Sequence, residues 1–461
     1  MTLPDGHHVS RVLADWCTSL SISDLPDAVV AKAEDCILDA IASAIPGRET
    51  PGARRIHEIA GSTYRHGPAG VWFTDTPLHR TGAAFANAAA ASMLDIDDGH
   101  RAALGHPGAA VVPAALAFAA ETDASGEDVL VAIVAGYEAC VRIGKSEKRK
   151  AYHTGNWSGF GACVAAGKLV GLDASQLAHA LAVTAYHGPR VADLTLSTDM
   201  GSNVKESIPW SVVAGMTAAD LAQKGFTGCR DALDIDERFE PDVALDGLGD
   251  GFMITRTYFK RYSACRWIHS SVEALLQIMQ ENNVTPDQID HVRVETFHQA
   301  ASLNNHADPH SLESAQYSVP YCLGLAAVLG ERALMPMSGD DLHNARAIKL
   351  ARKVDVRRVD EFDGAFPQTV PARVTVATQR DTFDKLVTTP WGEPDRAPSR
   401  ADMLGKLHSL ADGRISPDRA TAIGAGVEGL RTDGPGHLLD ILGEVSRRPG
   451  VAEEAIPASS I

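Results

Sequence analysis

The sequence predicts a mainly α-helical fold in the order helical region, α+β region, helical region. Alanine dominates the apolar residues, which make up 45% of the 461-residue chain, while aromatic residues reach only 6%. Small residues favour closely packed helices, because strands prefer β-branched and aromatic side chains. Helical patterns fill the chain before about residue 258 and after about residue 398, and alternating patterns lie only between them. This length predicts two domains, or one large domain with an insertion.

The first helix with clear signals begins at Pro26, a residue suited to a first helical turn. Its apolar residues recur on one helical face: Val29, Ala33, Cys36, Ile37 and Ala40. Residues 81–93 are almost all small, which predicts a helix buried on several sides.

Three more helices follow in this region. Ser125 and Asp128 have the spacing of a capping box and precede a long apolar helix. Two Ala/Gly-rich helices, 159–172 and 211–225, each end at a glycine that can stop a helix.

The pattern changes after about residue 258. Residues 291–297 and 372–378 alternate apolar and polar side chains, which predicts half-buried strands. A capped turn at Thr285 precedes the first strand, and helical patterns at 268–280 and 318–329 lie beside them. The last helices are predicted at 399–410, 420–429 and 436–446, followed by a loose tail.

Charge and cysteine content narrow the class of protein. The formal net charge is −17, which argues against nucleic acid or an anionic membrane as partner. The N-terminus lacks a basic segment followed by an apolar one, and the longest apolar stretch is too short to cross a bilayer, so a cytoplasmic protein is expected. The seven cysteines are dispersed without a CxxC pair, which is typical of a reducing compartment.

Common cofactor motifs are missing. The glycines at 247–251 follow no predicted strand and lack the GxGxxG spacing, so no dinucleotide site is expected. Neither HExxH nor a P-loop occurs. Three aspartates at 95, 97 and 98 lack the spacing of a calcium loop, which favours a carboxylate cluster or a catalytic acid over a metal site.

Two polar segments stand out against their Ala-, Gly- and Val-rich surroundings. The first is Asp95–Arg101 with His106, and the second is Asn203–Trp210, which contains Lys205. Removing ionisable groups from water is costly unless they pair or do chemistry, so these segments are the first candidates for a site.

These segments and several others, in the same order, resemble the MmgE/PrpD family, which includes 2-methylcitrate dehydratase, cis-aconitate decarboxylase and iminodisuccinate epimerase. The matching segments are Leu94–Asp98 with His106–Pro107, Gly159–Ala162, Lys205 ahead of Gly225–Gly228, Tyr258–His269, Val292–Phe297 and Ala315–Tyr321.

The resemblance implies an all-helical domain formed by residues 1–258 and 398–461, with a smaller α+β lid domain, 259–397, inserted into it. It also implies an active site in the cleft between the domains, a homodimer, no metal and no organic cofactor.

The reactions of this family remove or deliver a proton, or CO₂, at a carbon beside a carboxylate. The charge that develops on carboxylate oxygens requires cationic donors together with a general acid and base. Lys205 could serve either as a base or as a carboxylate-binding ammonium. His106 is the predicted acid or base, and Asp95 the carboxylate that orients it. Asp97 and Asp98 could equally cap the following helix.

The resemblance suggests further site residues. His153 is predicted to fill the family's second histidine position, with Tyr152 as the alternative. Tyr321 could donate a proton or hydrogen bond, or be a packed aromatic. The predicted substrate-binding residues are Arg101, Lys260, Arg266 and His269.

The predicted function is that of a cofactor-independent lyase that removes water or CO₂ from a small di- or tricarboxylate or hydroxy acid. An epimerase or isomerase of a related carboxylate is the alternative within the same chemistry. A non-catalytic helical scaffold or ligand-binding protein is the alternative outside it. Gly99, where several family members carry Thr, and the absence of a His-Xaa-Gly after Lys205 indicate that the substrate contacts differ from those of the named enzymes.

Overall fold

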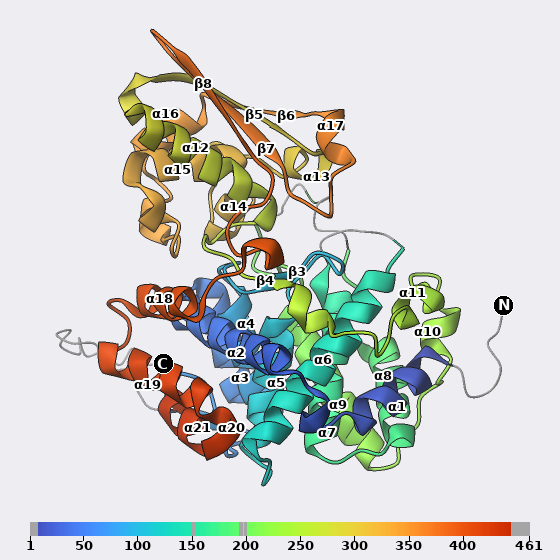
Figure 1. Ribbon diagram of the computed structural model, residues 1–461. Coiled ribbons are helices and arrows are strands. Elements are labelled where there is room, and N and C mark those ends of the chain that lie inside the picture. Colours follow the sequence, from blue (N-terminus) through green and yellow to red (C-terminus); the bar gives the residue numbers. More distant parts are fainter. Residues whose placement is uncertain (1–7, 149–152, 193–196, 198–200, 444–461) are drawn as a thin grey trace, which may run out of the picture.

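The computed structural model describes residues 8–148, 153–192, 197 and 201–443. Helices dominate these residues, and the longest strand has eight, so the predicted mainly α-helical fold is confirmed. Figure 1 shows a large helical body with a smaller α+β region standing on it. The predicted tail, the last dozen residues, lies outside the described residues, as do residues 444–446 of the last predicted helix.

The helical body is built first from the N-terminal half of the chain. Its helices are α1 (Val9–Ser19), α2 (Asp27–Gly47), α3 (Pro51–Thr63), α4 (Arg80–Ser92), α5 (Gly108–Ala119), α6 (Gly126–Ser146), α7 (Ser158–Leu169), α8 (Ala174–His187), α9 (Ile208–Gln223), α10 (Ala232–Ile235) and α11 (Pro241–Leu245). The two-residue strands β1 (Ala69–Gly70) and β2 (Pro77–Leu78) pair with each other.

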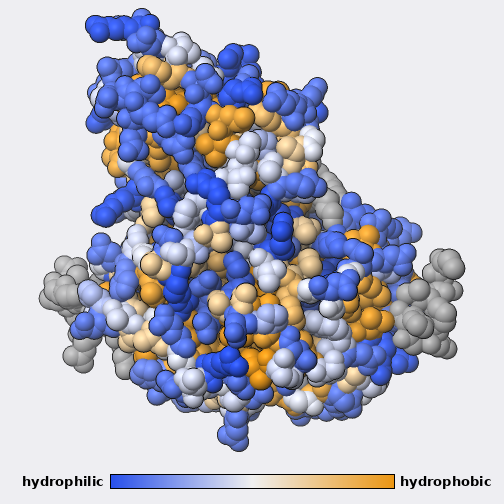
Figure 2. Space-filling view, viewed as in Figure 1, coloured by the Kyte–Doolittle hydropathy of each residue, from blue (hydrophilic) through white to orange (hydrophobic). Residues whose placement is uncertain are grey.

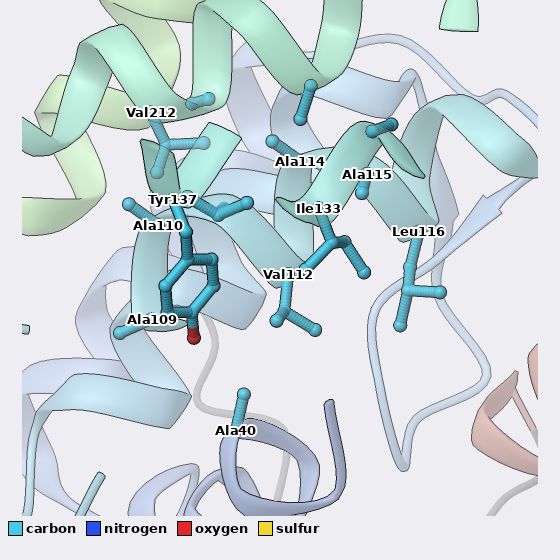
Figure 3. Close-up of a cluster of buried hydrophobic side chains, with 14 of the residues drawn as sticks. Ala40, Ala109, Ala110, Val112, Ala114, Ala115, Leu116, Ile133, Tyr137 and Val212 are labelled. Atoms are coloured by element: carbon cyan, nitrogen blue, oxygen red, sulfur yellow. The ribbon is translucent and has the colours of Figure 1, made fainter. Parts of the chain in front are cut away.

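Small side chains allow the central helices to approach one another closely. Every residue of α5 is buried, and Figure 3 shows its alanines and Val112 packed around Ile133, Tyr137 and Val212 from neighbouring helices. A methyl group on Gly161 of α7 would lie 2.6 Å from Val111, so only glycine fits at this crossing. The expected close packing of Ala/Gly-rich helices is therefore present.

Several predicted helix boundaries are confirmed. The Ser125–Asp128 capping box begins α6, and the predicted face of α2 is buried. Gly171 and Gly225 follow α7 and α9 with φ of 69° and 84°, the left-handed conformation in which glycine ends a helix. Helices α1, α3 and α8 belong to the same body but were not located by the sequence patterns.

The C-terminal segment returns to the helical body. The segment forms helices α18 (Arg400–Ala411), α19 (Pro417–Glu428), α20 (Leu430–Asp433) and α21 (Gly436–Gly443), of which α18 and α19 pack against α2 (Figure 1). Their buried residues, among them Met403, Leu407 and Ile423, join the same hydrophobic core as α2, α5 and α6.

The α+β region has a four-stranded sheet in the order β6-β5-β7-β8. Its strands are β5 (Ile289–Thr296), β6 (Val354–Arg358), β7 (Ala372–Thr378) and β8 (Thr382–Val387). Strands β5 and β6 are parallel, and the other neighbours are antiparallel. The helices of this region are α12 (His269–Asn282), α13 (His298–Ala301), α14 (Leu312–Gln316), α15 (Val319–Leu329), α16 (Ala345–Ala351) and α17 (Asp360–Asp363).

Both predicted strands are confirmed as β5 and β7, the two central strands, whose burial alternates along the chain. The edge strands β6 and β8 were not predicted. Their side chains are mostly exposed or half-buried, so their sequences carry little hydrophobic alternation.

The apolar core is divided between the two regions. One cluster extends from Val9 to Phe259 and resumes at Met403, and the other extends from Tyr262 to Val387. A short antiparallel ladder joins Gly99–His100 (β3) to Thr257–Tyr258 (β4) where the chain leaves the helical body. Figure 2 shows mostly hydrophilic side chains on one face of both regions. None of the described helices combines the length and apolar character needed to cross a membrane.

Candidate active site

The two polar segments meet at Asp95, which follows α4 in the left-handed conformation (φ 54°). Its Oδ1 accepts a hydrogen bond from Lys205 Nζ at 3.1 Å, and its Oδ2 lies 3.0 Å from Lys260 Nζ. The three side chains come from segments more than 50 residues apart and are all buried. Folding therefore places two ammonium groups on one carboxylate.

Lys205 Nζ donates three hydrogen bonds, to Asp95 Oδ1, Ser92 O and Gln316 Oε1. Three donated bonds use the full capacity of an ammonium group. Its backbone is also left-handed (φ 45°), as is that of Ser207, the residue that precedes α9. Such conformations concentrate at functional sites, where surrounding contacts offset their cost of about 1–3 kcal/mol. The geometry favours a cationic role for Lys205 over that of a base.

Lys260 is fully buried and lies on the other side of Asp95. Within the described residues its Nζ has no hydrogen bond of good geometry, although the carboxylate of Asp95 is near. A buried ammonium with unused donors is costly unless an anion completes its surroundings.

His106 presents one ring nitrogen to each side of the cluster. Its Nδ1 lies 2.8 Å from Asp98 O, a carbonyl that can only accept, so Nδ1 carries the proton. Nε2 lies 3.4 Å from Asp95 Oδ1 and 3.7 Å from Glu206 Oε1. Burial, followed by the positive charge of Lys260, lowers the pKa of His106 to about 3. The imidazole is therefore neutral at physiological pH, with Nε2 able to accept a proton.

The carboxyl groups of the cluster differ in charge. Burial disfavours the ionised form of Asp95, but Lys205, Lys260 and His106 outweigh it and hold its pKa below the usual range. Burial raises the pKa of Asp97 well above its usual value and that of Glu206 to about 7. The lysines therefore favour the ionised form of Asp95, whereas burial favours the protonated form of Asp97.

Contacts beneath the cluster fix the loop that carries Asp95. Asp98 Oδ1 accepts from Gly108 N at 3.0 Å, and Oδ2 accepts from the Tyr137 hydroxyl at 2.6 Å. Burial, with the nearby Asp39 carboxyl, raises the pKa of Asp98 to about 7. Of the alternatives left open for Asp98, the helix-capping role at the start of α5 is the one its contacts support.

Glycine is required where this loop meets β4. A methyl group at Gly99 would lie 2.4 Å from the ring of Tyr258. The close approach brings Tyr258, and with it the segment of Lys260, against the Asp95 loop. This contact explains why position 99 is glycine here, although several family members carry Thr at this position.

Arg101 and Arg266 form a second ionic cluster. Arg266 Nε lies 2.9 Å from Glu393 Oε1, and Arg101 Nη2 lies 2.7 Å from Glu393 Oε2. The guanidinium of Arg266 also stacks 4.8 Å from the ring centroid of Tyr258. The two predicted arginines are thus brought together, but on a carboxylate of the protein itself.

Within the part of the chain that the structure describes, the contacts of the other predicted residues lie away from Asp95. His153 Nδ1 lies 2.9 Å from Glu147 Oε2, and His269 packs against Tyr262 and Arg266. The Tyr321 hydroxyl donates to Asp341 O at 2.7 Å inside the core of the α+β region, because its position in α15 points it there. Its contacts match the packed-aromatic alternative. Tyr152 lies outside the described residues.

Three residues of the cluster were not selected from the sequence: Glu206, Gln316 and Tyr317. The ring centroid of Tyr317 lies 5.9 Å from Lys205 Nζ. Glu206 accepts hydrogen bonds from Thr154 through both its backbone N–H and its hydroxyl. Glu206 was detectable, because it follows Lys205 in the polar segment. Gln316 and Tyr317 lie within the matching segment Ala315–Tyr321, but spacing alone did not show which of its two tyrosines, Tyr317 or Tyr321, would reach the site.

Three side chains of the cluster are close enough together to be considered as ligands of a metal ion. Ligand atoms of Asp95, His106 and Glu206 lie within 4.8 Å of one another. Lys205 and Lys260, however, are in contact with Asp95 and would repel a cation. The donor set therefore fits an anion better than a metal.

One pocket reaches this cluster from the surface. It has a volume of about 340 Å³ and is lined by Gly52, Arg55, Ile56, Ser92, Met93 and residues 203–210. Lys205 and Glu206 are the cluster members that border it.

Comparison with known proteins agrees with this architecture. The MmgE/PrpD N-terminal domain model matches residues 11–244, and the MmgE/PrpD C-terminal domain model matches residues 262–431. A cis-aconitate decarboxylase of Aspergillus terreus is 26% identical over 94% of this chain and 96% of its own length. A cis-aconitate decarboxylase-like protein, oryM, of Aspergillus oryzae is 25% identical over 93% and 95%, respectively. The chain belongs to the MmgE/PrpD family.

Proposed function

We propose that this protein is a lyase that removes CO₂ or water from a small di- or tricarboxylate at the Asp95 cluster. The observation that carries the proposal is the buried ammonium of Lys260, which has unused donors beside Lys205, Asp95 and a neutral His106. The names of the two similar decarboxylases make loss of CO₂ the first reaction to test.

The charge of the cluster suits an anionic substrate. Two ammonium groups face one ionised carboxylate, Asp95, while His106 is neutral and burial favours the protonated forms of Asp97 and Glu206. With Glu206 protonated, one positive charge is in excess, and a substrate carboxylate would balance it.

The same groups can stabilise the reaction's charged state. In decarboxylation the bond from the substrate carbon to the departing carboxylate breaks, and its electron pair is shared with a neighbouring carboxylate. Lys260 would hold that carboxylate and Lys205 would keep Asp95 in place, while His106 Nε2 takes a proton that comes from solvent and gives it to the carbon. In dehydration, His106 Nε2 would instead accept the α-proton before water leaves.

Domain and assembly expectations belong to this proposal. The α+β region, 259–397, would act as a lid over the helical domain formed by 1–258 and 398–461, with substrate between them. We further propose turnover without a metal or organic cofactor, and the metal part of this proposal is tested by comparing activity before and after exhaustive chelation. Chelation should leave the rate unchanged.

A homodimer is proposed as the assembly. Exposed apolar side chains on the helical body, including Tyr186 and Phe226, would supply contact surface for a second copy. Light scattering on the purified protein should give twice the chain mass, and a monomer mass would contradict it.

The reaction is tested by incubating the protein with a panel of hydroxy- and unsaturated di- and tricarboxylates in D₂O, followed by NMR. A lyase yields a product lacking CO₂ or water, with deuterium incorporated during decarboxylation. Exchange of the α-proton without net elimination would instead indicate an epimerase. Loss of turnover in both Lys205→Ala and His106→Ala is expected, and unchanged turnover in both would contradict the proposed site.

A further inference from the structure

Glu206 occupies a distinct position in the cluster. Its Oε2 is fixed by the backbone N–H and hydroxyl of Thr154, which come from the turn before α7. Its Oε1 makes no hydrogen bond within the described residues and points toward His106, 3.7 Å from Nε2. The side chain is about 1% exposed, so this oxygen is held aimed at the imidazole.

Glu206 also borders the surface pocket, whereas His106 and Asp95 do not. The pocket wall is largely apolar and includes Ile56, Met93 and Trp210. Glu206 therefore both borders a surface pocket and approaches the proton-accepting nitrogen of His106.

We propose that Glu206 is a relay residue that carries protons between this pocket and His106 Nε2. This inference rests on the proposed lyase function and adds to it a proton path separate from substrate entry. A distance of 3.7 Å is slightly longer than a hydrogen bond, and such contacts commonly shorten when substrate binds.

The transfer balances in protons and charge. Glu206 gives its proton to Nε2, and the resulting imidazolium gives it to the substrate carbon that has lost CO₂. The ionised Glu206 then takes a proton from water in the pocket. In dehydration the same path runs in reverse and exports the α-proton.

The charged and titratable groups facing Glu206 are His106, Asp95, Lys205 and Tyr317. Burial is the main cause that raises the pKa of Glu206 to about 7, and Asp95 adds to it, while Thr154 and Lys205 act against it. A group that exchanges protons near neutral pH is suited to both halves of the cycle.

The first test replaces the carboxyl group with an amide of the same shape. Glu206→Gln should lower kcat about 100-fold, with a smaller change in KM, and remove the decline in rate near pH 7 that follows ionisation of Glu206. The matched control is Glu313→Gln. Glu313 is also buried and bonds to pocket-lining Asn203, but has no described contact with His106. This control should retain the rate and the pH profile.

The second test is rescue by a small acid. In Glu206→Ala, added formate buffer should raise the rate of this variant at least tenfold, in proportion to the formate concentration. The reason is that formic acid can enter the vacated space through the pocket. Adding Ile56→Trp, which narrows the pocket, should reduce this rescue, because formic acid then reaches the vacated space less easily. Absence of rescue together with wild-type kcat in Glu206→Gln would overturn the proton path.

A third measurement does not depend on turnover. Infrared difference spectra between pH 6 and pH 8 should show a carboxylic-acid carbonyl band that is lost in Glu206→Gln and kept in Glu313→Gln. If this band is present but no substrate reacts, the proposed lyase function fails while the proton-holding role stands. If substrate reacts and Lys205→Ala is inactive, but the Glu206→Gln spectrum and rate equal those of the wild type, the proton path fails alone.

Discussion

At the scale of single residues, the central feature is one ionised aspartate between two lysines. Asp95 lies 3.1 Å from Lys205 Nζ and 3.0 Å from Lys260 Nζ, with all three groups buried. Lys205 uses its donors on protein atoms, whereas Lys260 has donors to spare. We therefore assign substrate attraction mainly to Lys260 and support of Asp95 mainly to Lys205.

Replacing Lys260 with methionine tests this division. Lys260→Met preserves most of the side-chain volume but removes the positive charge, so kcat/KM should fall by roughly 100-fold or more, as expected for loss of a buried electrostatic contact. Steady-state kinetics measure the effect. The control Lys385→Met removes an exposed ion pair with Glu281 and should change neither activity nor stability by more than about 1 kcal/mol. Equal activity of both variants would contradict the assignment.

The raised pKa of Glu206 predicts a pH-dependent stability. The folded protein keeps this proton up to about pH 7, whereas the unfolded chain releases it near the ordinary value of 4.5. The contribution of Glu206 to folding is therefore complete below pH 4.5 and is lost as pH rises through 7. Comparing chemical denaturation of the wild type and Glu206→Gln at pH 5 and pH 8 should show a difference of up to about 3 kcal/mol in their pH response. Parallel stability curves would contradict this ionisation.

At the scale of elements, helix α18 supports the loop that carries Asp95. Lys406 Nζ of α18 donates to Asp39 Oδ1 of α2 at 2.6 Å and to Ile96 O at 2.7 Å. The C-terminal segment thereby holds the residue next to Asp95. The C-terminal helices therefore help to position the loop that carries Asp95, although they lie far from it in the sequence.

Lys406→Met should destabilise the protein by about 3–5 kcal/mol, because Asp39 would remain buried without its cation. Urea denaturation followed by circular dichroism measures the change. Adding Asp39→Asn should recover part of the loss, since the uncompensated charge is then removed. If the double variant is as unstable as the sum of both single losses, the two residues are not coupled.

Sequence patterns predicted those elements whose boundaries are determined by interactions within a few residues. The capping box at Ser125 and the glycines after α7 and α9 act within a few residues and are independent of the rest of the fold. Strands β6 and β8 were missed because edge strands gain stability from pairing with β5 and β7, which a single segment does not reveal.

At the scale of the whole molecule, Glu393 links the two regions. It lies near the end of the α+β region and contacts Arg266 of that region and Arg101 of the Asp95–Arg101 segment. Together with the β3–β4 ladder, this ionic cluster places Lys260 beside Asp95. The relative position of the two regions thus determines whether Lys260 of the α+β region lies beside Asp95 of the helical body.

Glu393→Gln should weaken this link, because two arginines would face an uncharged amide. We expect faster hydrogen–deuterium exchange at residues 99–101 and 257–266, and at least a tenfold fall in kcat/KM. Glu361→Gln, which removes an exposed pair with Arg373, is the control and should exchange like the wild type. Unchanged exchange in Glu393→Gln would show that the ladder alone maintains the arrangement.

The sequence by itself determined the helical class, the order of the regions and the two polar segments, because composition, periodicity and burial cost are local properties. It also indicated Asp95, His106, Lys205 and Lys260, which meet in one cluster. Only the tertiary structure decided that Glu206 and Tyr317 join them while Tyr321 packs inside the α+β region. The reason is physical: which side chains converge depends on how distant helices and loops cross, and spacing along the chain carries no information about that crossing.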